Sequence, residues 1–414
     1  MRPDAVAPAG ILVDIARCIG CRSCEAACQT YHGFPPGPAA DLGPQAWTYV
    51  ALRRLRTARP HMSLGDGGKH QRTFKVQCMH CLDPACASAC PVGALRKSAR
   101  GPVIYDAGRC IGCRYCMVAC PFQVPRFEWH RPLPVITKCN MCAERQARGA
   151  QPVCVEACPA GALQFGPRAD LLLEAARRMR AHPGRYVPAV YGAEEAGGTS
   201  VLYISDVPFE ELGFPVVVRE APVGVHLEGA RQGPRRRGRP GRHAHRRGGP
   251  QPEATRAPGV RSSGRPEGRD PSMTPGRHRS SGRLCLWLMV LGGVAIAVRR
   301  YLYGIGAVTA LSDRFPWGLW VGFDILCGVA LAAGGFTMAA IAHVLHARRY
   351  QPLVRPAVLT GFLGYLLVII ALLVDLGRPY RIWHALVMWN PRSVMFEVAW
   401  CVMLYTAVLA LEFG

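Results

Sequence analysis

The chain has 414 residues, half of them apolar, and carries 19 cysteines and a formal net charge of +23. This length predicts two or three domains. The cysteines are clustered in repeated spacings, which favours metal ligation over the disulfide framework of small secreted proteins. So basic a chain could bind nucleic acid or an anionic membrane, and the position of the charge decides between these uses.

The composition changes twice along the chain and predicts three domains. Residues 1–220 are soluble in character and hold sixteen of the cysteines. Residues 221–283 are rich in Arg, Gly and Pro, and residues 284–414 form long apolar segments. The first sixteen residues contain neither a twin arginine nor a long apolar core, so we expect no signal peptide.

An internal repeat organises the first domain, because residues 18–28 are mirrored by 110–120 and residues 90–95 by 158–163. We expect short strands at 10–14, 102–105 and 162–165, and a short helix after the third cysteine of each group. An amphipathic helix at 170–182 and a strand at 199–204 complete the expected elements. The predicted class is α+β.

The sixteen cysteines fall into four groups with ferredoxin-like spacing. Two-residue gaps allow three thiolates to converge on one [4Fe–4S] cubane, while the fourth cysteine reaches a neighbouring cluster. Four clusters are therefore predicted; the alternative is zinc, which also takes four thiolates. The groups are Cys18, Cys21, Cys24, Cys28; Cys78, Cys81, Cys86, Cys90; Cys110, Cys113, Cys116, Cys120; and Cys139, Cys142, Cys154, Cys158.

Several polar residues lie close to these groups in sequence. His80, between two cysteines, is expected to donate a hydrogen bond to a cluster rather than to ligate it. Nearby basic residues either offset the negative charge of the clusters or lie on a solvated face; they are Lys75, Arg96, Lys97, Arg114 and Lys138. Nothing in the sequence indicates bond-making catalysis. The three remaining cysteines are expected to be packed thiols.

The middle segment cannot form a core. Residues 221–272 contain twelve Arg and no Lys, Ile, Phe, Tyr, Trp, Met or Cys, so we expect disorder. A solvated linker and an arm that binds RNA or anionic lipid are alternatives. The composition is also that of GC-rich coding DNA read out of frame, with Met273 as the start of a second protein. We hypothesise a frameshift or gene fusion that joins two neighbouring subunits.

The third domain predicts about four membrane-spanning helices, at 284–303, 317–343, 356–374 and 394–411, each near the roughly 20 residues that a bilayer requires. Ionisable residues in or beside such spans are candidates for quinone contact or proton transfer. They can also be ordinary helix-end residues, although Asp324 and Glu397 are expected to lie deeper. The candidates are Asp324, His343, Asp375, Arg378, His384 and Glu397.

Three motifs carry a family resemblance: Gln77 to Cys86, Gly112 to Pro125, and Cys154 to Leu163. They resemble the four-cluster ferredoxin subunits of membrane oxidoreductases, such as the partners of dimethyl sulfoxide, polysulfide and tetrathionate reductases. The segment 191–208 narrows the resemblance to the ferredoxin subunit of hydrogenase-2-type [NiFe] hydrogenases. That subunit normally carries a twin-arginine signal and an anchor helix, and neither is expected here.

The resemblance also implies a ligand set for each of the four clusters, in which one cysteine crosses between groups. The first set is Cys18, Cys21, Cys24 and Cys158, and the second is Cys28, Cys139, Cys142 and Cys154. The third set is Cys78, Cys81, Cys86 and Cys120, and the fourth is Cys90, Cys110, Cys113 and Cys116.

The apolar part resembles the quinone-reactive membrane subunit of the polysulfide-reductase type, through residues 312–320, 375–379 and 383–384. Members of that family have eight to ten spans, so about half is expected to be missing, and no haem is expected. The predicted function is electron transfer between a hydrogenase catalytic partner and membrane quinone, with no nucleic-acid partner. A molybdopterin or polysulfide/tetrathionate-type reductase partner is the alternative; a zinc- or nucleic-acid-binding regulator is a further one.

The expected location is the inner membrane. The basic residues beside the first span and in the loop between the second and third spans place the clusters in the cytoplasm by the positive-inside rule. The family resemblance implies the periplasm instead. Both sides remain open from the sequence.

Overall fold

The computed structural model describes residues 7–55, 71–217, 278–346 and 348–413. The described residues form two compact units. One unit contains the residues up to 217 together with those from Ile296 onward, and the other contains the first part of the helix that ends at Tyr303. The predicted linker and Met273 fall almost wholly outside the described residues. A helix begins at His278, within the range 221–283 expected for the linker, and the domain division stays a prediction.

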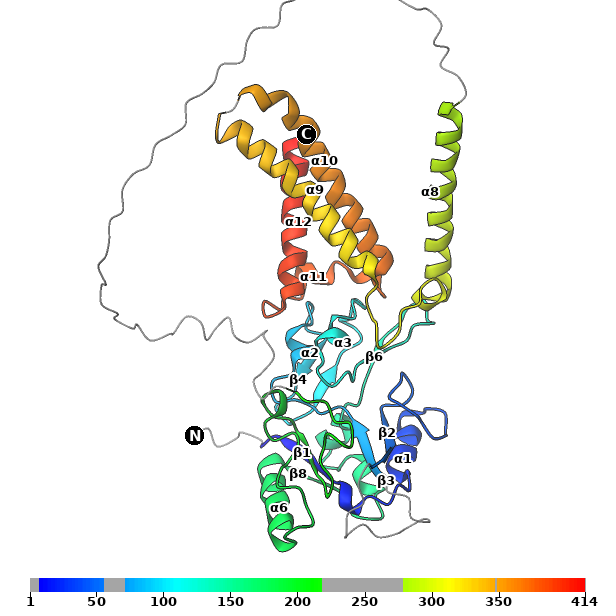
Figure 1. The fold of residues 1–414 in the computed structure, drawn as a ribbon, viewed down its shortest axis with the longest axis vertical. Coiled ribbons are helices and arrows are strands. Elements are labelled where there is room, and N and C mark those ends of the chain that lie inside the picture. The colour runs from blue at the N-terminus through cyan, green and yellow to red at the C-terminus, as the bar shows by residue number, and fades with distance from the viewer. Residues whose placement is uncertain (1–6, 56–70, 218–277, 347, 414) are drawn as a thin grey trace, which may run out of the picture. The chain divides into compact units, whose positions relative to one another are not determined.

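The cysteine-rich part is an α+β fold built on a three-stranded sheet (Figure 1). Strand β1 lies in the centre, antiparallel to β8 and parallel to β9. Three two-stranded ribbons surround it: β2 with β3, β4 with β5, and β6 with β7. The strands are β1 (Ala9–Asp14), β2 (Thr48–Arg54), β3 (Gln71–Gln77), β4 (Leu95–Lys97), β5 (Val103–Tyr105), β6 (Arg126–Phe127), β7 (Ile136–Thr137), β8 (Leu163–Pro167) and β9 (Val201–Ile204).

Short helices carry the cysteines between these strands. They are α1 (Ser23–His32), α2 (Ala85–Ser88), α3 (Tyr115–Ala119), α4 (Ala143–Ala147) and α5 (Val153–Glu156), followed by the surface helix α6 (Arg168–Ala181). Helices α1, α2, α3 and α5 contain the third cysteine of their group, whereas the sequence predicted helices that follow it. The expected strands at 10–14, 102–105, 162–165 and 199–204 and the helix at 170–182 are each present within a few residues.

The internal repeat is visible in the backbone. Arg22 and Arg114 occupy the same position in the two halves, and each precedes a cysteine-bearing helix. Both have a left-handed backbone, with φ of 58° and 62°. The tight turn that this conformation makes brings the cysteines on either side of the arginine toward one centre.

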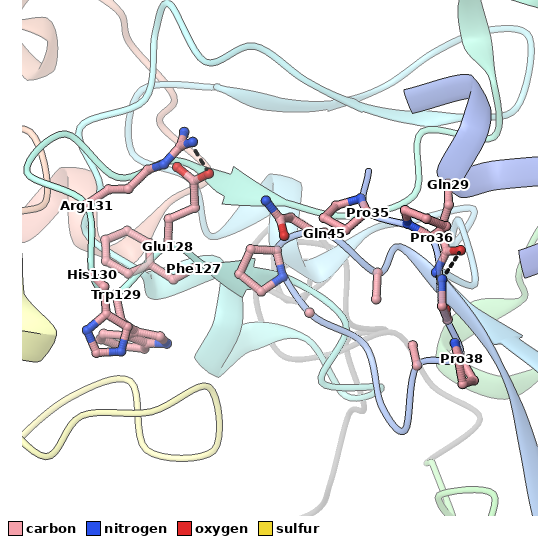
Figure 2. A pocket seen from close by; sticks show the side chains of 15 residues that line it. Gln29, Pro35, Pro36, Pro38, Gln45, Phe127, Glu128, Trp129, His130 and Arg131 are labelled. Atoms are coloured by element: carbon pink, nitrogen blue, oxygen red, sulfur yellow. Dashed lines mark hydrogen bonds and ion pairs between the residues drawn. The ribbon is translucent and has the colours of Figure 1, made fainter. Parts of the chain in front are cut away.

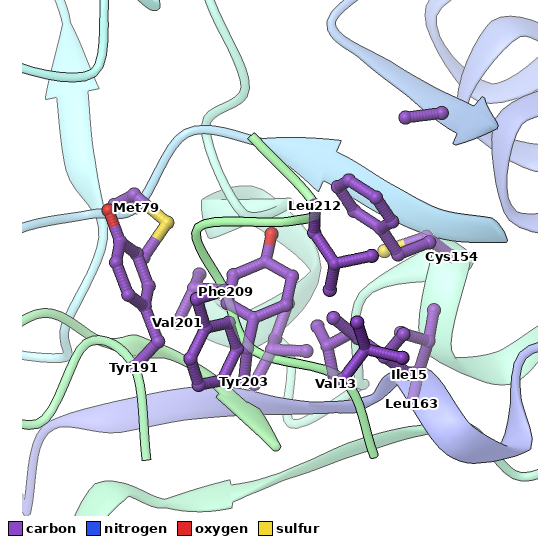
Figure 3. Packing of buried hydrophobic residues seen from close by; sticks show 14 of the residues in the cluster. Val13, Ile15, Met79, Cys154, Leu163, Tyr191, Val201, Tyr203, Phe209 and Leu212 are labelled. Atoms are coloured by element: carbon purple, nitrogen blue, oxygen red, sulfur yellow. The ribbon is translucent and has the colours of Figure 1, made fainter. Parts of the chain in front are cut away.

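The core of the cysteine-rich part joins the central sheet to the segment after β9 (Figure 3). Tyr203 from β9 and Tyr191 pack edge-on against each other and against Phe214. Fully buried apolar side chains of β1 and β9 fill the remaining space. This packing fixes the segment beyond residue 190 against the cysteine loops.

Four described helices are long and apolar enough to cross a membrane, as predicted. A 25-residue helix extends about 36 Å and therefore exceeds the roughly 30 Å hydrocarbon core. The short helix α11 (His384–Val387) precedes the last of them. The long helices are α8 (His278–Tyr303), α9 (Leu319–His343), α10 (Gln351–Asp375) and α12 (Val394–Phe413).

Helix α10 packs against both α9 and α12. Small residues permit the closest approach: a Cβ atom added to Gly335 of α9 would lie 2.7 Å from the carbonyl oxygen of Ala357. Tyr365 of α10 and Tyr405 of α12 stack with ring centroids 6.2 Å apart. Close backbone contact through small residues is typical of helix packing in membranes. The sequence predicted that this span starts at Pro356. In the structure α10 begins earlier, at Gln351, and Pro356 lies inside it.

Candidate iron–sulfur sites and their contact with the membrane helices

The first ligand set lies around one small cavity. Cys18, Cys21, Cys24 and Cys158 line it together with apolar side chains and two cations, Arg22 and Lys75. Among the sixteen cysteines, all of which lie in the described part, only Cys21 is exposed. Burial, followed by neighbouring thiols, raises the pKa of Cys24 to about 12. A cysteine from group four therefore joins three from group one, as the crossing arrangement requires.

The second set forms where α1 meets α5. Cys24 and Cys28 lie one turn apart on α1, and Cys28 turns toward the thiols of group four. Burial raises the pKa of the Cys28 thiol above its usual value, and the neighbouring thiols of Cys139, Cys154 and Cys142 raise it further. A single helix thus supplies one cysteine to each of two sets.

Groups two and three exchange their fourth cysteines in the same way. Burial is the main cause of a raised pKa at Cys86, and Cys120 is the next. Burial also raises the pKa of Cys116, with added contributions from the thiols of Cys113, Cys90 and Cys110. The neighbours of these thiols agree with the four sets that the family resemblance implies, and ligation of clusters by these sets stays a prediction.

Several cysteine sulfur atoms accept hydrogen bonds from the backbone. Within the described residues, no group of three or more His, Cys, Asp or Glu side chains is placed to hold a single metal ion. Backbone N–H groups donate to several sulfur atoms: Ala94 to Cys90 at 3.1 Å, Gly112 to Cys110 at 3.3 Å, and Met141 to Cys139 at 3.3 Å. Such donors stabilise thiolate ligands and tune cluster potential.

His80 is completely buried beside the third set. Its Nδ1 accepts a hydrogen bond from the Val103 N–H at 2.9 Å, so a neutral ring carries its proton on Nε2. Burial first, and then the nearby charge of Lys138, holds the pKa of His80 well below its usual value. Nε2 has no partner among the described residues, which is compatible with donation to a cluster and leaves that role a prediction.

The loops around the fourth set contact the segments that connect the membrane helices. Trp317 donates from Nε1 to the carbonyl oxygen of Cys113 at 3.0 Å. Asn390 donates to the carbonyl oxygen of Cys90 at 2.7 Å, and Ser393 donates to that of Ala89 at 2.7 Å. Two ligands of the fourth set are therefore anchored through their own peptide groups.

Two glycines allow a direct backbone contact in the same region. The N–H of Gly377 donates to the carbonyl oxygen of Gly112 at 3.2 Å, and the N–H of Arg378 donates to that of Ile111 at 3.0 Å. A Cβ atom on Gly112, whose φ is +74°, would lie 2.8 Å from Cα of Gly377. Only glycine permits this approach.

Three of the predicted quinone or proton residues belong to this contact. Asp375 forms an ion pair with Arg114, with an N–O distance of 2.6 Å. Arg378 donates to the carbonyl oxygens of Pro134 at 3.0 Å and Ala107 at 2.8 Å. His384, which is buried, donates from Nδ1 to the carbonyl oxygen of Arg109 at 2.9 Å. Their observed partners are protein groups, and a role in quinone binding stays a prediction.

Two further candidates for quinone contact or proton transfer, His343 and Glu397, lie away from this contact. His343 is the last residue of α9 and is exposed, so it lies about 36 Å from the start of that helix at Leu319. Glu397 is also exposed and lies in the first turn of α12, so the expectation that it lies deep is wrong. The side chain of Asp324 falls outside the described residues.

Sequence reasoning overlooked several contact residues because their partners are distant in the chain. Asp313 accepts hydrogen bonds from the Phe127 N–H at 3.1 Å and from Trp129 Nε1 at 2.9 Å. Asp313 and Trp317 lie within the segment 312–320 that carries the membrane resemblance, which was the available signal. For Asn390 and Ser393, the sequence contained no signal of this kind.

A surface groove with a volume of about 730 Å³ lies elsewhere (Figure 2). A proline-rich loop over residues 35–46 forms one wall, and residues 127–131 form the other. Glu128 and Arg131 pair across 3.1 Å at its edge. None of the sixteen cysteines lines this groove, so it is separate from the cluster sets.

Comparison with known families agrees with this division of the chain. Residues 70–168 match a family model described as a 4Fe-4S dicluster domain. Residues 307–413 match one described as polysulphide reductase, NrfD. The two matches lie in the cysteine-rich part and in the membrane helices, and the first cysteine group and α8 fall outside them.

Two relatives from Escherichia coli match about half of the chain or less. The chain is 37% identical to hydrogenase-2 operon protein HybA of Escherichia coli O157:H7 over 248 residues, which cover 52% of this chain and 75% of HybA. It is 41% identical to the probable anaerobic dimethyl sulfoxide reductase chain YnfG of E. coli K12, over 39% of this chain and 75% of the relative.

A protein of Nitratidesulfovibrio vulgaris is 47% identical over 49% of this chain, which spans only 56% of that relative's length. With the cysteine sets and the two family matches, these similarities establish that the chain belongs to the 4Fe-4S iron–sulfur subunit family of HybA and the dimethyl sulfoxide reductase chains, joined to a membrane domain of the polysulphide reductase, NrfD, type.

Proposed function

We propose that this chain relays electrons through four [4Fe–4S] clusters between a hydrogenase-type catalytic partner and membrane quinone. Bound clusters would supply one-electron carriers, each held by one of the four cysteine sets. The chain's own residues hold the clusters, bury all four cysteines of the second set, and fix the fourth set against the membrane helices.

The contact between the fourth set and the membrane segments is the observation that carries this proposal. Cys90 and Cys113 each accept a hydrogen bond through their carbonyl oxygen from a residue of the membrane part. The first set, which contains the exposed Cys21, is the natural place for electrons to enter or leave at a soluble partner. The sets thus offer a route from solvent to membrane.

The proposed location is the inner membrane. Four long apolar helices and the polysulphide reductase, NrfD, match support membrane insertion. The side of the membrane on which the cysteine-rich part lies can be measured. A reporter fused to the chain, with a cysteine that reacts with a thiol reagent on one side of the membrane only, would determine it.

Purified full-length chain in detergent would test the proposal. We expect sixteen iron and sixteen sulfide per chain if each of the four sets holds one four-iron cluster, with reduced-state electron paramagnetic resonance (EPR) signals that decay when a menaquinone analogue is added. A stoichiometric zinc content without sulfide would overturn the proposal. So would full cluster content with no electron transfer to quinone.

A reductase partner remains a second candidate because of the similarity to YnfG. The two partners differ in the direction of electron flow. Reduction of the clusters by hydrogen in the presence of a [NiFe] catalytic subunit would support the hydrogenase assignment. Oxidation of prereduced clusters by a sulfoxide with a molybdopterin subunit would support the other.

A further inference from the structure

The chain contains only four lysines among its 50 basic residues, and two of them are buried among the cysteine sets. These two are Lys75 and Lys138, with exposed fractions of 2% and 5%. Arginine is the common cation everywhere else in the chain. A lysine ammonium is a compact point charge, whereas the planar guanidinium of arginine needs a wider site.

Lys75 lies between the first and second sets. It sits on β3 opposite Val50 of β2, and its side chain lines the cavity formed by the four thiols of the first set. Its ammonium donates to the side-chain oxygen of Gln77. The thiols whose charges act on it are Cys24 of the first set and Cys28, Cys139 and Cys154 of the second.

Lys138 occupies the corresponding place between the second and third sets. Its Nζ lies 3.9 Å from the sulfur of Cys78, in the third set. It also donates to the carbonyl oxygens of Val103 at 2.5 Å and of Cys139 at 2.9 Å, and Cys139 is a ligand of the second set. Its charge also acts on Cys86 and Cys120 of the third set.

Neither lysine takes part in an ion pair with a carboxylate in the described part of the chain. A buried ammonium without a counter-charge is costly. Clusters held by four thiolates are negative, and net charge near a cluster sets its reduction potential. A fixed cation at the junction of two clusters therefore stabilises the added electron on either one.

We propose that Lys75 and Lys138 are redox-tuning counter-cations at successive cluster junctions, so that each raises the potentials of two neighbouring clusters and the second set responds to both. This inference rests on the proposed function, because it requires the four clusters. The charge of each lysine stays fixed: one electron enters a cluster and no proton moves.

The test is an EPR-monitored redox titration of full-length chain carrying Lys75→Met or Lys138→Met. Methionine keeps the length of the side chain and removes its charge. We expect each variant to lower two of the four cluster potentials, with a change of about tenfold in the reduction equilibrium, or about 59 mV for one electron. The EPR signal of the cluster in the second set should shift in both variants.

Arg54→Met is the matched control, because Arg54 is an exposed cation on the strand paired with Lys75's strand. It should leave all four potentials unchanged. The inference is overturned if the lysine variants retain four clusters and shift none of them, shift all four equally, or share no signal. Absence of clusters from the unaltered chain would instead reject the proposed function.

A second measurement leaves Lys75 and Lys138 in place, in case a variant of either fails to assemble. The chain, labelled with ¹⁵N-lysine, should show ¹⁵N coupling to its reduced clusters by pulsed EPR. Lys97 is labelled too and donates to the carbonyl oxygen of His80 at 2.8 Å, so the coupling is measured in a Lys97→Met background. Absence of any coupling in a chain with full iron content would overturn the inference.

Discussion

The guanidinium of Arg114 and the carboxylate of Asp375 form an ion pair at 2.6 Å between residues that are 261 positions apart. The Arg114 side chain is completely buried. Its guanidinium lies over the rings of Phe127 and Trp129, 5.5 Å and 5.7 Å from their centroids. Because Arg114 directly follows Cys113, the pair connects the ligand loop of the fourth set to the end of α10.

Breaking this pair should destabilise the contact. In Asp375→Asn the arginine stays buried without a counter-charge, and a loss of about 3 kcal/mol is expected for a buried pair broken from one side. Thermal unfolding of the detergent-solubilised chain should show a lower midpoint. The double variant Arg114→Met/Asp375→Leu removes both charges and should recover much of the loss. Equal midpoints for Asp375→Asn and the unaltered chain would contradict this account.

A methyl group at the glycine contact should have a more local effect. In Gly377→Ala, the new Cβ atom would lie 2.8 Å from the ring of Phe127 and 3.3 Å from Cα of Gly112. The Phe127 ring or the backbone must therefore shift, and we expect slower electron transfer from the reduced clusters to a quinone analogue with full iron content. Gly43→Ala is the control, since nothing lies within 4 Å of its added Cβ atom. Equal transfer rates in the two variants would argue against a close contact at this glycine.

The cysteine groups and the long apolar helices could be predicted from the sequence because each follows a local pattern. Cys18 to Cys28 and its repeat carry their spacing within eleven residues, and α9 and α10 are continuous apolar runs. The pairing of β2 with β3 was not predicted. Their alternation of charged and apolar residues is short, and residues 56–70 separate them.

The contact residues could not be found from the sequence for a different reason. Asp375 and His384 were singled out as ionisable residues near membrane spans, and their chemistry suggested quinone. Their observed partners, Arg114 and the carbonyl oxygen of Arg109, lie more than 250 residues away. Such pairings are set by tertiary packing, which a single sequence does not report. The same limit applies to Lys75, whose position between two sets depends on the pairing of β3 with β2.

The crossing of ligands between groups can be tested at Cys28. In Cys28→Ser, the cluster held with Cys139, Cys142 and Cys154 should be lost or converted to a three-iron form, because a serine oxygen replaces one thiolate ligand. The missing EPR signal should be the one that Cys142→Ser also removes, and it should differ from the signal lost in Cys21→Ser. Cys285→Ser, at an exposed cysteine outside the four sets, should change none. If Cys28→Ser removed the same signal as Cys21→Ser, the ligands would not cross.

Acid should weaken the ion pairs that Glu174 forms within α6. Hydrogen bonds from Arg177 and then Arg178 lower the pKa of this carboxyl to about 2, compared with about 4.3 in an unfolded chain. The folded state therefore favours the carboxylate. Its stabilisation is complete above the unfolded pKa and is lost as the pH falls toward about 2.

Because the pair with Arg177 is near the surface, the contribution should be no more than about 1 kcal/mol. Thermal midpoints measured between pH 6 and pH 3 should fall less steeply for Glu174→Gln than for the unaltered chain, and the two curves should approach each other at the acid end. Any acid damage to the clusters is common to both proteins and cancels in the comparison. Parallel curves over this range would show that the Glu174 carboxylate contributes nothing to folding.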